Sequence, residues 1–291
     1  MDSLLITTAD EKNQIRKLYD ISEAQIKESV ELIKAWIAKQ PHLPQNLTDD
    51  CIEKVLLRNK YRVERTKQKL DNYYSLRGHN RDLIRGFENV VPSEHVSTYL
   101  PMPKLTPKLE RIIIMKILKP EAELYDIMEV IKNNLATTEL LFKYDDSVGV
   151  RYLYDFQGFT LRHMARMNPV PIIKQISMIE KGYSCRMLGV DLIMALLKLL
   201  LRPKIYERVK IHPDLESVYE VMPRDCLPSE YGGTYSTIPK LTKMWDKAIR
   251  DHRQFFVDNF NNISLEHLRP LEVPDSGAYG VHGTFKNLTL D

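Results

Sequence analysis

Residues Arg111 to Leu118 read RIIIMKIL, and Pro120 follows shortly after them. A short β-branched run that is closed by a proline is typical of a buried strand. The next segment, Ala122 to Leu141, carries apolar side chains at helical spacing, and Val148 to Asp155 alternates as a strand does. Strand, helix and strand in succession predict an α/β layer with a largely parallel sheet.

The same alternation continues toward the C-terminus. We expect a helix over Ile172 to Glu180, a strand over Cys185 to Ile193 that leads into an apolar helix to Leu201, and a short strand over Arg208 to His212. Ile238 to Phe260 predicts one further amphipathic helix. The tail beyond it is rich in Gly and Asn and is expected to be loosely ordered.

The first third of the chain has the period of helices instead. Ser22 and Gln25 resemble a capping box, and Thr48 offers a cap for a second helix. A third helix is expected over Val63 to Arg77. The prolines between Pro92 and Pro107 indicate loops and a domain boundary. We therefore expect an N-terminal helical domain (1–95), an α/β domain (96–236), and a C-terminal helix with its tail (237–291).

Composition limits the class of protein. Apolar residues make up 43% and charged residues 28% of the chain, which is an ordinary globular mixture, and the net charge is +3. That charge is too small to indicate a nucleic-acid partner. Cys51, Cys185 and Cys226 are odd in number and far apart in sequence, a pattern that fits reduced thiols in a cytosol better than a set of disulfides. The longest near-apolar run, Leu192 to Leu201, has half the length that spans a bilayer. We expect a cytoplasmic protein that touches membranes only at their surface.

The patterns of common catalytic and metal sites are missing from the sequence. Gly232-Gly233 lies outside any strand-to-helix phosphate turn, and Ser184 lacks the second glycine of a nucleophile elbow. The eight histidines have no metal-ligand spacing. Asp145-Asp146 is expected on a solvated turn, and no histidine lies near Cys226 in sequence to activate its thiol. No catalytic residue, metal or cofactor is expected, and the chain is not predicted to be an enzyme.

Several segments of the sequence, in order along the chain, resemble one known family. Leu227 to Gly233 (LPSEYGG) is similar to the C-terminal signature of the CRAL-TRIO lipid-binding family, which includes tocopherol- and retinaldehyde-binding members. Lys204 to His212 (KIYERVKIH) and Gly149 to Phe159 (GVRYLYDFQGF) precede it in the family's order. Trp36 to Asp50, followed by Arg62 to Arg77, resembles the family's N-terminal helical domain. The amino-acid sequence of these segments is most similar to that of insect members of the family.

The resemblance implies a helical bundle beside an α/β domain whose sheet floors an apolar cavity under a helical lid. Asp155 and Gly158 match the family's strand-Asp-x-x-Gly pattern, and Leu192 to Leu201 corresponds to the lid. Read without the resemblance, an all-apolar helix is a core helix. After Arg186 the chain lacks about ten residues of the family pattern, which as helix would span ~15 Å. The resemblance therefore implies a short lid or one with a different hinge.

Candidate pocket residues come from strand and helix faces, weighted by the resemblance. For each of them the alternative is an ordinary core position. A hydroxyl in an apolar pocket can orient the polar head of a ligand, which singles out Thr138, Tyr154 and Tyr183. The full candidate set is Leu135, Thr138, Val150, Tyr154, Phe159, Ile179, Tyr183, Met187 and Val190, with Leu196, Leu197 and Leu200 from the lid.

A basic cluster beside the lid engages phosphoinositide head groups in the tocopherol-transfer branch of the family. By resemblance, Arg186, Lys204 and Arg208 occupy three of its positions, whereas Asn59 and Leu188 replace two further basic residues. The alternative is that the three basic residues are solvated charges that flank apolar segments.

Three classes of function follow. The first is an intracellular protein that binds a tocopherol, retinoid, carotenoid or similar lipid and transfers it between membranes. The second is a phosphoinositide- or membrane-sensing adaptor of the same fold, with cargo binding impaired by the short lid. The third is an enzyme whose residues are dispersed along the chain. A monomer is expected in each case, with a hydrophobic ligand and a membrane surface as its partners.

Overall fold

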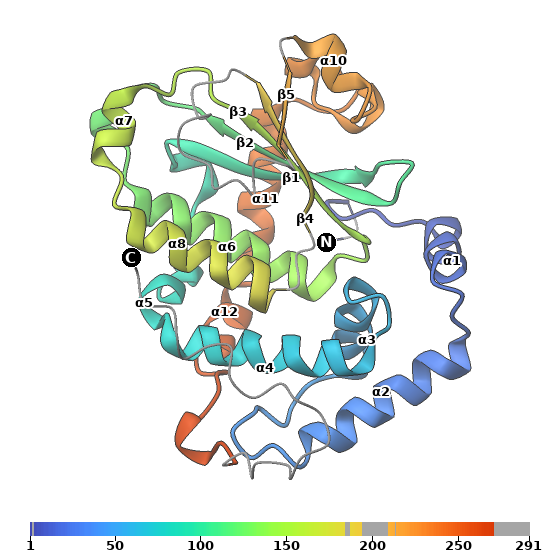
Figure 1. The fold of residues 1–291 in the computed structure, drawn as a ribbon. Helices are drawn as coiled ribbons and strands as arrows, with labels where there is room; N and C mark the ends of the chain where they lie inside the picture. Colours follow the sequence, from blue (N-terminus) through green and yellow to red (C-terminus); the bar gives the residue numbers. More distant parts are fainter. Residues whose placement is uncertain (2, 184–186, 194–208, 213, 271–291) are drawn as a thin grey trace, which may run out of the picture.

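The computed structural model describes residues 1, 3–183, 187–193, 209–212 and 214–270, without the side chains of residues 93, 187–193 and 209. Figure 1 shows the described elements in layers: the sheet, then α6 (Ile127–Tyr144) and α8 (Pro169–Ser177), then α4 (Val63–His79). The expected fold class, a mostly parallel α/β layer with a helical N-terminal region, is confirmed.

The N-terminal helices begin where the caps predicted. Ser22 accepts a hydrogen bond from the Gln25 amide, and the Gln25 side chain returns to Ser22, so the capping box is formed. Thr48 likewise accepts from the Cys51 amide. Both helices bury their predicted stripes, because the period of their apolar residues matches the helical turn. The region contains α1 (Ala9–Leu18), α2 (Glu23–Ile37), α3 (Asp49–Arg58), α4 and α5 (Arg81–Ile84).

The five described strands follow chain order across the sheet. β2 (Glu110–Ile117) is the strand predicted from RIIIMKIL, and it pairs in parallel with β3 (Gly149–Asp155). β4 (Met187–Ile193) and β5 (Val209–His212) extend the parallel part. Only β1 (Ser97–Leu105) runs antiparallel to its neighbour, β2.

The expected loop between Pro92 and Pro107 is wrong, because β1 lies inside it. Pro101 and Pro103 are both in this strand, and the register shifts between Pro101 and Leu105. A proline cannot donate to a strand ladder, so it is tolerated only at an edge or a bulge, and β1 offers both. The carbonyls of both prolines accept hydrogen bonds from side chains. Trp245 Nε1 donates to the Pro101 oxygen at 3.2 Å, and Arg111 donates to the Pro103 oxygen.

The helices between the strands differ from prediction at their ends. Asp126 caps α6 by accepting from the Met128 amide, so the α-helix begins after the predicted start at Ala122. Leu124, inside the predicted helix range, therefore lies in the short segment before α6 and is exposed. After α7 (Leu161–Arg166), α8 passes at Met178 into a π-helical turn, η4 (Met178–Gly182).

The two motifs of the resemblance meet in space. Tyr231, within LPSEYGG, donates its hydroxyl to Asp155 Oδ2 at 2.8 Å across the end of β3. Gly232 has φ +65°, and a Cβ at Gly233 would lie 2.5 Å from the carbonyl carbon of Leu227. These two glycines therefore have a structural role in the turn, with Leu227 fully buried beneath them.

Short helical segments complete the connections before and after the sheet. They are η1 (Phe87–Asn89), η2 (Pro92–Glu94), η3 (Ala122–Leu124), α10 (Leu215–Tyr219), η5 (Arg224–Cys226) and η6 (Ser229–Tyr231).

The C-terminal helix is two helices instead of one. α11 (Ile238–Asp251) ends at His252, whose backbone leaves the helical conformation, and α12 (Arg253–Phe260) follows. His252 Nδ1 contacts the Ala248 carbonyl at 2.7 Å, and its Nε2 contacts the Tyr144 hydroxyl at 2.9 Å. The break therefore rests on a contact with α6 that the helical period does not reveal.

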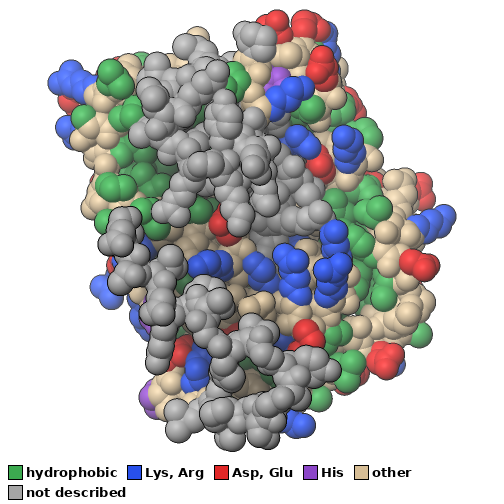
Figure 2. Space-filling model, in the orientation of Figure 1, with side chains coloured by type: hydrophobic (Ala, Val, Ile, Leu, Met, Phe, Trp, Pro, Cys, Tyr) green, Lys and Arg blue, Asp and Glu red, His purple; other side chains and the backbone are tan. Residues whose placement is uncertain are grey.

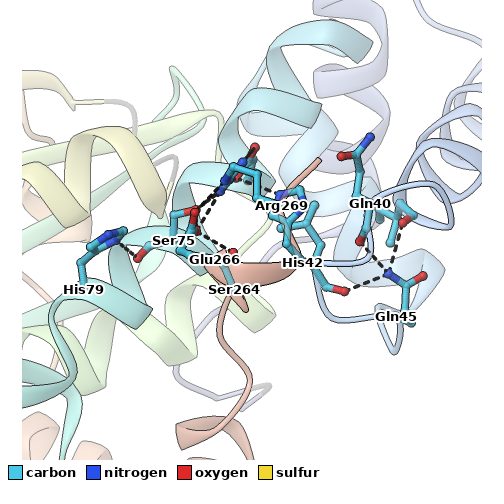
Figure 3. A network of polar contacts seen from close by, with 11 residues as sticks. Gln40, His42, Gln45, Ser75, His79, Ser264, Glu266 and Arg269 are labelled. Atoms are coloured by element: carbon cyan, nitrogen blue, oxygen red, sulfur yellow. Dashed lines mark hydrogen bonds and ion pairs between the residues drawn. The ribbon is translucent and has the colours of Figure 1, made fainter. Parts of the chain in front are cut away.

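Part of the expected loose tail is ordered. In Figure 3, Arg269 and Glu266 lie against Ser75 of α4, beside His42. Arg269 also donates through two nitrogens to Asp71 of α4, both at 2.8 Å. The segment 261–270, which contains η7 (Glu266–Leu268), is thus held on the N-terminal helices, whereas residues 271–291 lie outside the described residues.

The expectation that Asp145-Asp146 forms a solvated turn is wrong for Asp145. This side chain is buried and forms an ion pair at 2.8 Å with Arg111, which is also buried. Burial opposes ionisation of Asp145, but Arg111, Arg58 and Ser147 outweigh it and lower the pKa of the carboxyl. The pair joins the start of β2 to the end of α6.

Candidate ligand-binding site

A strip of hydroxyl groups lies between α6 and the sheet. The hydroxyl of Tyr99 on β1 is 3.2 Å from that of Tyr152 on β3 and 3.2 Å from Thr138 Oγ1 on α6. Thr138 Oγ1 also contacts the Asn134 carbonyl at 2.7 Å. All four residues are buried, and Asn134 Oδ1 has no hydrogen-bond partner among the described residues. A buried acceptor without a partner is costly, so the Oδ1 of Asn134 suits a ligand or a water that donates to it.

Apolar residues surround the strip. Leu135 is fully buried on α6, and Val150 is buried on β3, as the sequence predicted for a core or a pocket. Tyr154 is only partly exposed, and its ring lies 5.8 Å from that of Tyr152. Burial raises the pKa of Tyr154 to about 12, so its phenol stays neutral at physiological pH. The surroundings favour a largely hydrophobic ligand with one polar group.

An aromatic cluster extends the site at the carboxyl end of β3. Tyr154 stacks on Phe156 at 5.9 Å, Phe156 meets Phe159 edge-on at 5.7 Å, and Phe159 stacks on His163 at 5.2 Å. Tyr125 closes the cluster, 5.5 Å from His163. The carboxyl ends of parallel strands are where ligands bind in open α/β sheets.

Sequence reasoning found Tyr154 and Phe159 but missed Tyr125, Phe156 and His163. His163 is fully buried, its Nδ1 accepts from the Thr160 amide at 3.1 Å, and its Nε2 has no partner among the described residues. The signal was the Thr160-x-x-His163 spacing, in which the histidine closes a capping box. A polar surface depression adjoins the cluster at Tyr125 but offers little apolar wall.

The candidates on η4 serve a different network. Ile179 and Tyr183 are buried, and the Tyr183 hydroxyl donates to Glu139 Oε1 at 2.7 Å. Glu139, on α6, also accepts from Tyr73 at 2.7 Å and forms an ion pair with Arg77. Because the hydroxyl proton of Tyr183 is committed to Glu139, this side chain ties η4 to α4 and α6.

Of the remaining candidate residues, the structure describes only the backbone of some and does not describe the others. Met187 pairs with Val150 and Val190 with Tyr152 in the β3–β4 register, but the side chains of β4 are not described. The lid residues Leu196, Leu197 and Leu200 and the basic residues Arg186, Lys204 and Arg208 lie outside the described residues. Their roles stay predictions.

In the part of the chain that the structure describes, no three His, Cys, Asp or Glu side chains come together as a metal site. Among the same residues, no helix has the length and apolar character that crossing a bilayer requires.

Comparisons with known proteins agree with this arrangement. Residues 97–233 match the model of the CRAL/TRIO domain, and residues 22–87 match that of the Pinta-like UBA domain. The "Alpha-tocopherol transfer protein-like" protein of Homo sapiens is 26% identical over 274 residues, which cover 88% of this chain and 77% of that protein. Its counterpart in Mus musculus is 25% identical with the same coverage.

More distant matches span similar lengths. Clavesin-1 of Xenopus laevis is 19% identical over 275 residues, which cover 87% of this chain and 82% of that protein. The solved structure titled "Crystal structure of Sfh5" aligns with 85% of this chain and all of that chain at 14% identity, with a TM-score of 0.36 that adds nothing to the assignment. The domain match over 97–233, the related sequences and the mostly parallel sheet identify a CRAL/TRIO domain in residues 97–233 of this chain.

Proposed function

We propose that this chain binds one small hydrophobic molecule between α6 and the sheet and transfers it between membranes. The observation that carries the proposal is the buried hydroxyl strip of Tyr99, Tyr152 and Thr138, set in apolar surroundings, together with the buried and unpartnered Oδ1 of Asn134, one turn before Thr138 on α6. A tocopherol, retinoid or carotenoid with a single polar group matches this distribution of polarity. The names of the related transfer proteins point to the same class.

Burial of an apolar ligand supplies enough free energy for stable binding. Burying about 400–500 Å² of apolar ligand surface contributes on the order of 10 kcal/mol at ~25 cal/mol per Å². Association and ordering cost several kcal/mol of this. The remainder corresponds to micromolar or tighter binding. Release then requires the cavity to open, and we assign that step to the lid residues Leu196, Leu197 and Leu200 at a bilayer surface.

The cellular part of the proposal follows from the same chemistry. A carrier of water-insoluble cargo works as a cytoplasmic monomer that visits membranes, and it needs no catalytic residue or cofactor. We propose that Arg186, Lys204 and Arg208 contact phosphoinositide head groups at the membrane. Three basic residues at ~1 kcal/mol each give salt-sensitive attraction instead of permanent anchoring.

Extraction of the purified protein with organic solvent, followed by mass spectrometry, tests the proposal. We expect about one equivalent of an apolar molecule with one polar group per protein. A protein that is empty, and that also fails to take up retinoid and tocopherol analogues, would contradict cargo binding. If that empty protein binds liposomes, the membrane-sensing adaptor is the better reading.

A further inference from the structure

His163 carries a hydrogen-bond donor whose position is fixed by its own contacts. Its Nδ1 accepts from the backbone amide of Thr160 at 3.1 Å, and the Thr160 hydroxyl lies 3.0 Å from the same nitrogen. Because a backbone amide can only donate, Nδ1 holds a lone pair, and the proton of the neutral ring is on Nε2. This Nε2–H has no acceptor among the described residues, although the side chain is fully buried.

The aromatic rings around His163 do not satisfy this donor. Phe159 stacks on the imidazole with 25° between the ring planes, so it covers the face of the imidazole, whereas the Nε2–H bond lies in the ring plane. Tyr125 meets the imidazole edge-on, and its hydroxyl accepts no hydrogen bond from Nε2. A buried donor without an acceptor destabilises the folded protein, so its presence indicates an acceptor that is not part of the described chain.

Space for such an acceptor begins one ring away from His163. Tyr125, which contacts the imidazole, also lines the surface depression beside α6. Leu124 of η3 and Leu161 of α7 are 54% and 71% exposed, and these two elements pack together. Figure 2 shows hydrophobic side chains on the part of the face where Figure 1 places α7 and the start of α8. An apolar molecule therefore meets apolar surface next to the aromatic cluster.

A path of aromatic rings links His163 to the hydroxyl strip. Tyr152 and Tyr154 lie on one face of β3 with their ring centroids 5.8 Å apart, and Phe156 stacks 5.9 Å beyond Tyr154. Tyr152 and Phe156 are four residues apart in extended chain, which spans about 13 Å at ~3.3 Å per residue. An unpartnered acceptor, Asn134 Oδ1, thus lies toward one end of this apolar path, and an unpartnered donor lies at the other.

We propose that His163 Nε2–H binds an accepting oxygen at the far end of the cargo, while a hydroxyl of the same molecule is bound at the strip. The class of cargo is an apolar molecule of retinoid length that carries a hydroxyl group at one end and a carbonyl group at the other. This inference rests on the proposed function, and it narrows the cargo from a molecule with one polar group to one with a second, accepting oxygen. A molecule whose far end is a hydrocarbon would leave the His163 donor without an acceptor.

Titration with two retinoids, followed by quenching of tryptophan fluorescence, tests the proposal. Retinol has only the hydroxyl, whereas 4-oxoretinol has the hydroxyl and a ring ketone at the opposite end. We expect the parent to bind 4-oxoretinol about tenfold more tightly than retinol, because the buried donor gains its acceptor.

Two substitutions of His163 separate its donor from its structural role. His163→Phe keeps an aromatic ring but has no donor, so the ratio of the two affinities should fall to about one. His163→Gln keeps both roles, because its Oε1 can accept from the Thr160 amide as in a capping box while its Nε2 donates, so most of the preference should remain. His95→Phe is the matched control. His95 also has a buried ring nitrogen without a partner among the described residues, but it follows η2, outside the aromatic cluster, and its substitution should leave the ratio unchanged.

A second readout needs no substitution. In nitrogen-15 NMR spectra of the parent, the His163 Nε2 resonance should move further on addition of 4-oxoretinol than on addition of retinol. The proposal is overturned by equal shifts, by equal affinities of the parent for the two retinoids, by a preference that survives in His163→Phe, or by a parent that binds neither retinoid. A parent that binds both equally, or that binds neither but yields another apolar cargo on extraction, leaves the proposed function intact.

Discussion

At the scale of single residues, the most constrained position is Gly233. An added Cβ would lie 2.5 Å from the carbonyl carbon of Leu227 and 2.7 Å from the Arg224 oxygen, and both of these are backbone atoms that cannot turn away. Gly86 offers a contrast, because its φ of +88° requires glycine but nothing lies within 4 Å of an added Cβ. The two glycines separate steric exclusion from backbone conformation.

Gly233→Ala should therefore destabilise the protein by more than about 2 kcal/mol, whereas Gly86→Ala should cost only the left-handed penalty of about 1 kcal/mol. Thermal unfolding followed by circular dichroism measures both. Equal melting temperatures in the two variants would show that the turn at Gly233 relaxes without cost, and that its close approach to Leu227 does not matter.

Thr138 tests the hydroxyl strip at the same scale. Thr138→Val should weaken binding of a hydroxyl-bearing retinoid about fivefold relative to its methyl ether, because one hydrogen bond in the strip is lost. Thr66→Val on α4 is the matched control: Thr66 is also buried and also donates to a carbonyl four residues earlier, Arg62. Fluorescence titration of the parent and both variants measures these affinities. If Thr138→Val leaves the ratio of affinities for the two ligands unchanged, the hydroxyl strip does not contact the ligand.

At the scale of elements, Glu139 joins four segments of the chain. It lies on α6, accepts from Tyr73 of α4 and Tyr183 after η4, and pairs with Arg77 of α4. Arg77 in turn donates to the Asn259 carbonyl of α12 at 2.6 Å. Each of these partners is buried or nearly so, so the network is sensitive to the loss of one charge.

Glu139→Gln should lower the free energy of unfolding by about 3–5 kcal/mol, because the buried guanidinium of Arg77 loses its counter-charge. Glu64→Gln removes an ion pair whose carboxylate is 84% exposed and should cost less than about 1 kcal/mol. Urea unfolding gives both values. A loss at Glu139 no greater than that at Glu64 would mean that the network does not hold the elements together.

At the scale of the whole molecule, the C-terminal segment fastens onto the N-terminal helices. The amides of Ser264 and Leu265 donate to the carbonyls of Tyr74 and His42, at 3.1 and 2.8 Å. Arg269 then closes the contact on Asp71 and Glu266. One apolar cluster includes residues from the N-terminal helices, the sheet and α11, so these regions share a core.

The fastening should weaken in acid. Hydrogen bonds from Arg269 lower the pKa of Glu266 to about 2, from an ordinary value of 4.5. A carboxyl with a lowered pKa stabilises the folded state above its unfolded pKa, and this contribution is lost as the pH falls from about 4.5 toward 2. We expect Arg269→Ala to melt below the parent at neutral pH, with a difference that shrinks over that window.

Differential scanning calorimetry between pH 7 and pH 2 checks this, with Arg250→Ala as the control. Arg250 is exposed on α11 and has no ion pair among the described residues, so its removal should change the melting temperature little at any pH. A difference between parent and Arg269→Ala that stays constant down to pH 2 would contradict the role of Glu266.

The sequence by itself determined the elements whose signals are local. The isoleucine run of β2, the alternation of β3 and the caps at Ser22 and Thr48 all predicted what formed, because burial period and cap chemistry act over a few residues. The motif LPSEYGG carried the resemblance to a known family. That resemblance pointed to the CRAL/TRIO domain, and the comparisons match that domain over residues 97–233.

Only the tertiary structure decided the features that depend on distant partners. β1 forms despite its prolines because it lies at the sheet edge, and α11 ends where His252 meets Tyr144 of α6. Asp145 is buried because Arg111 lies against it, and Tyr183 donates to Glu139 instead of standing free in a pocket. For His252, Asp145 and Tyr183 the deciding partner lies tens of residues away, and such a contact exists only once the chain has folded.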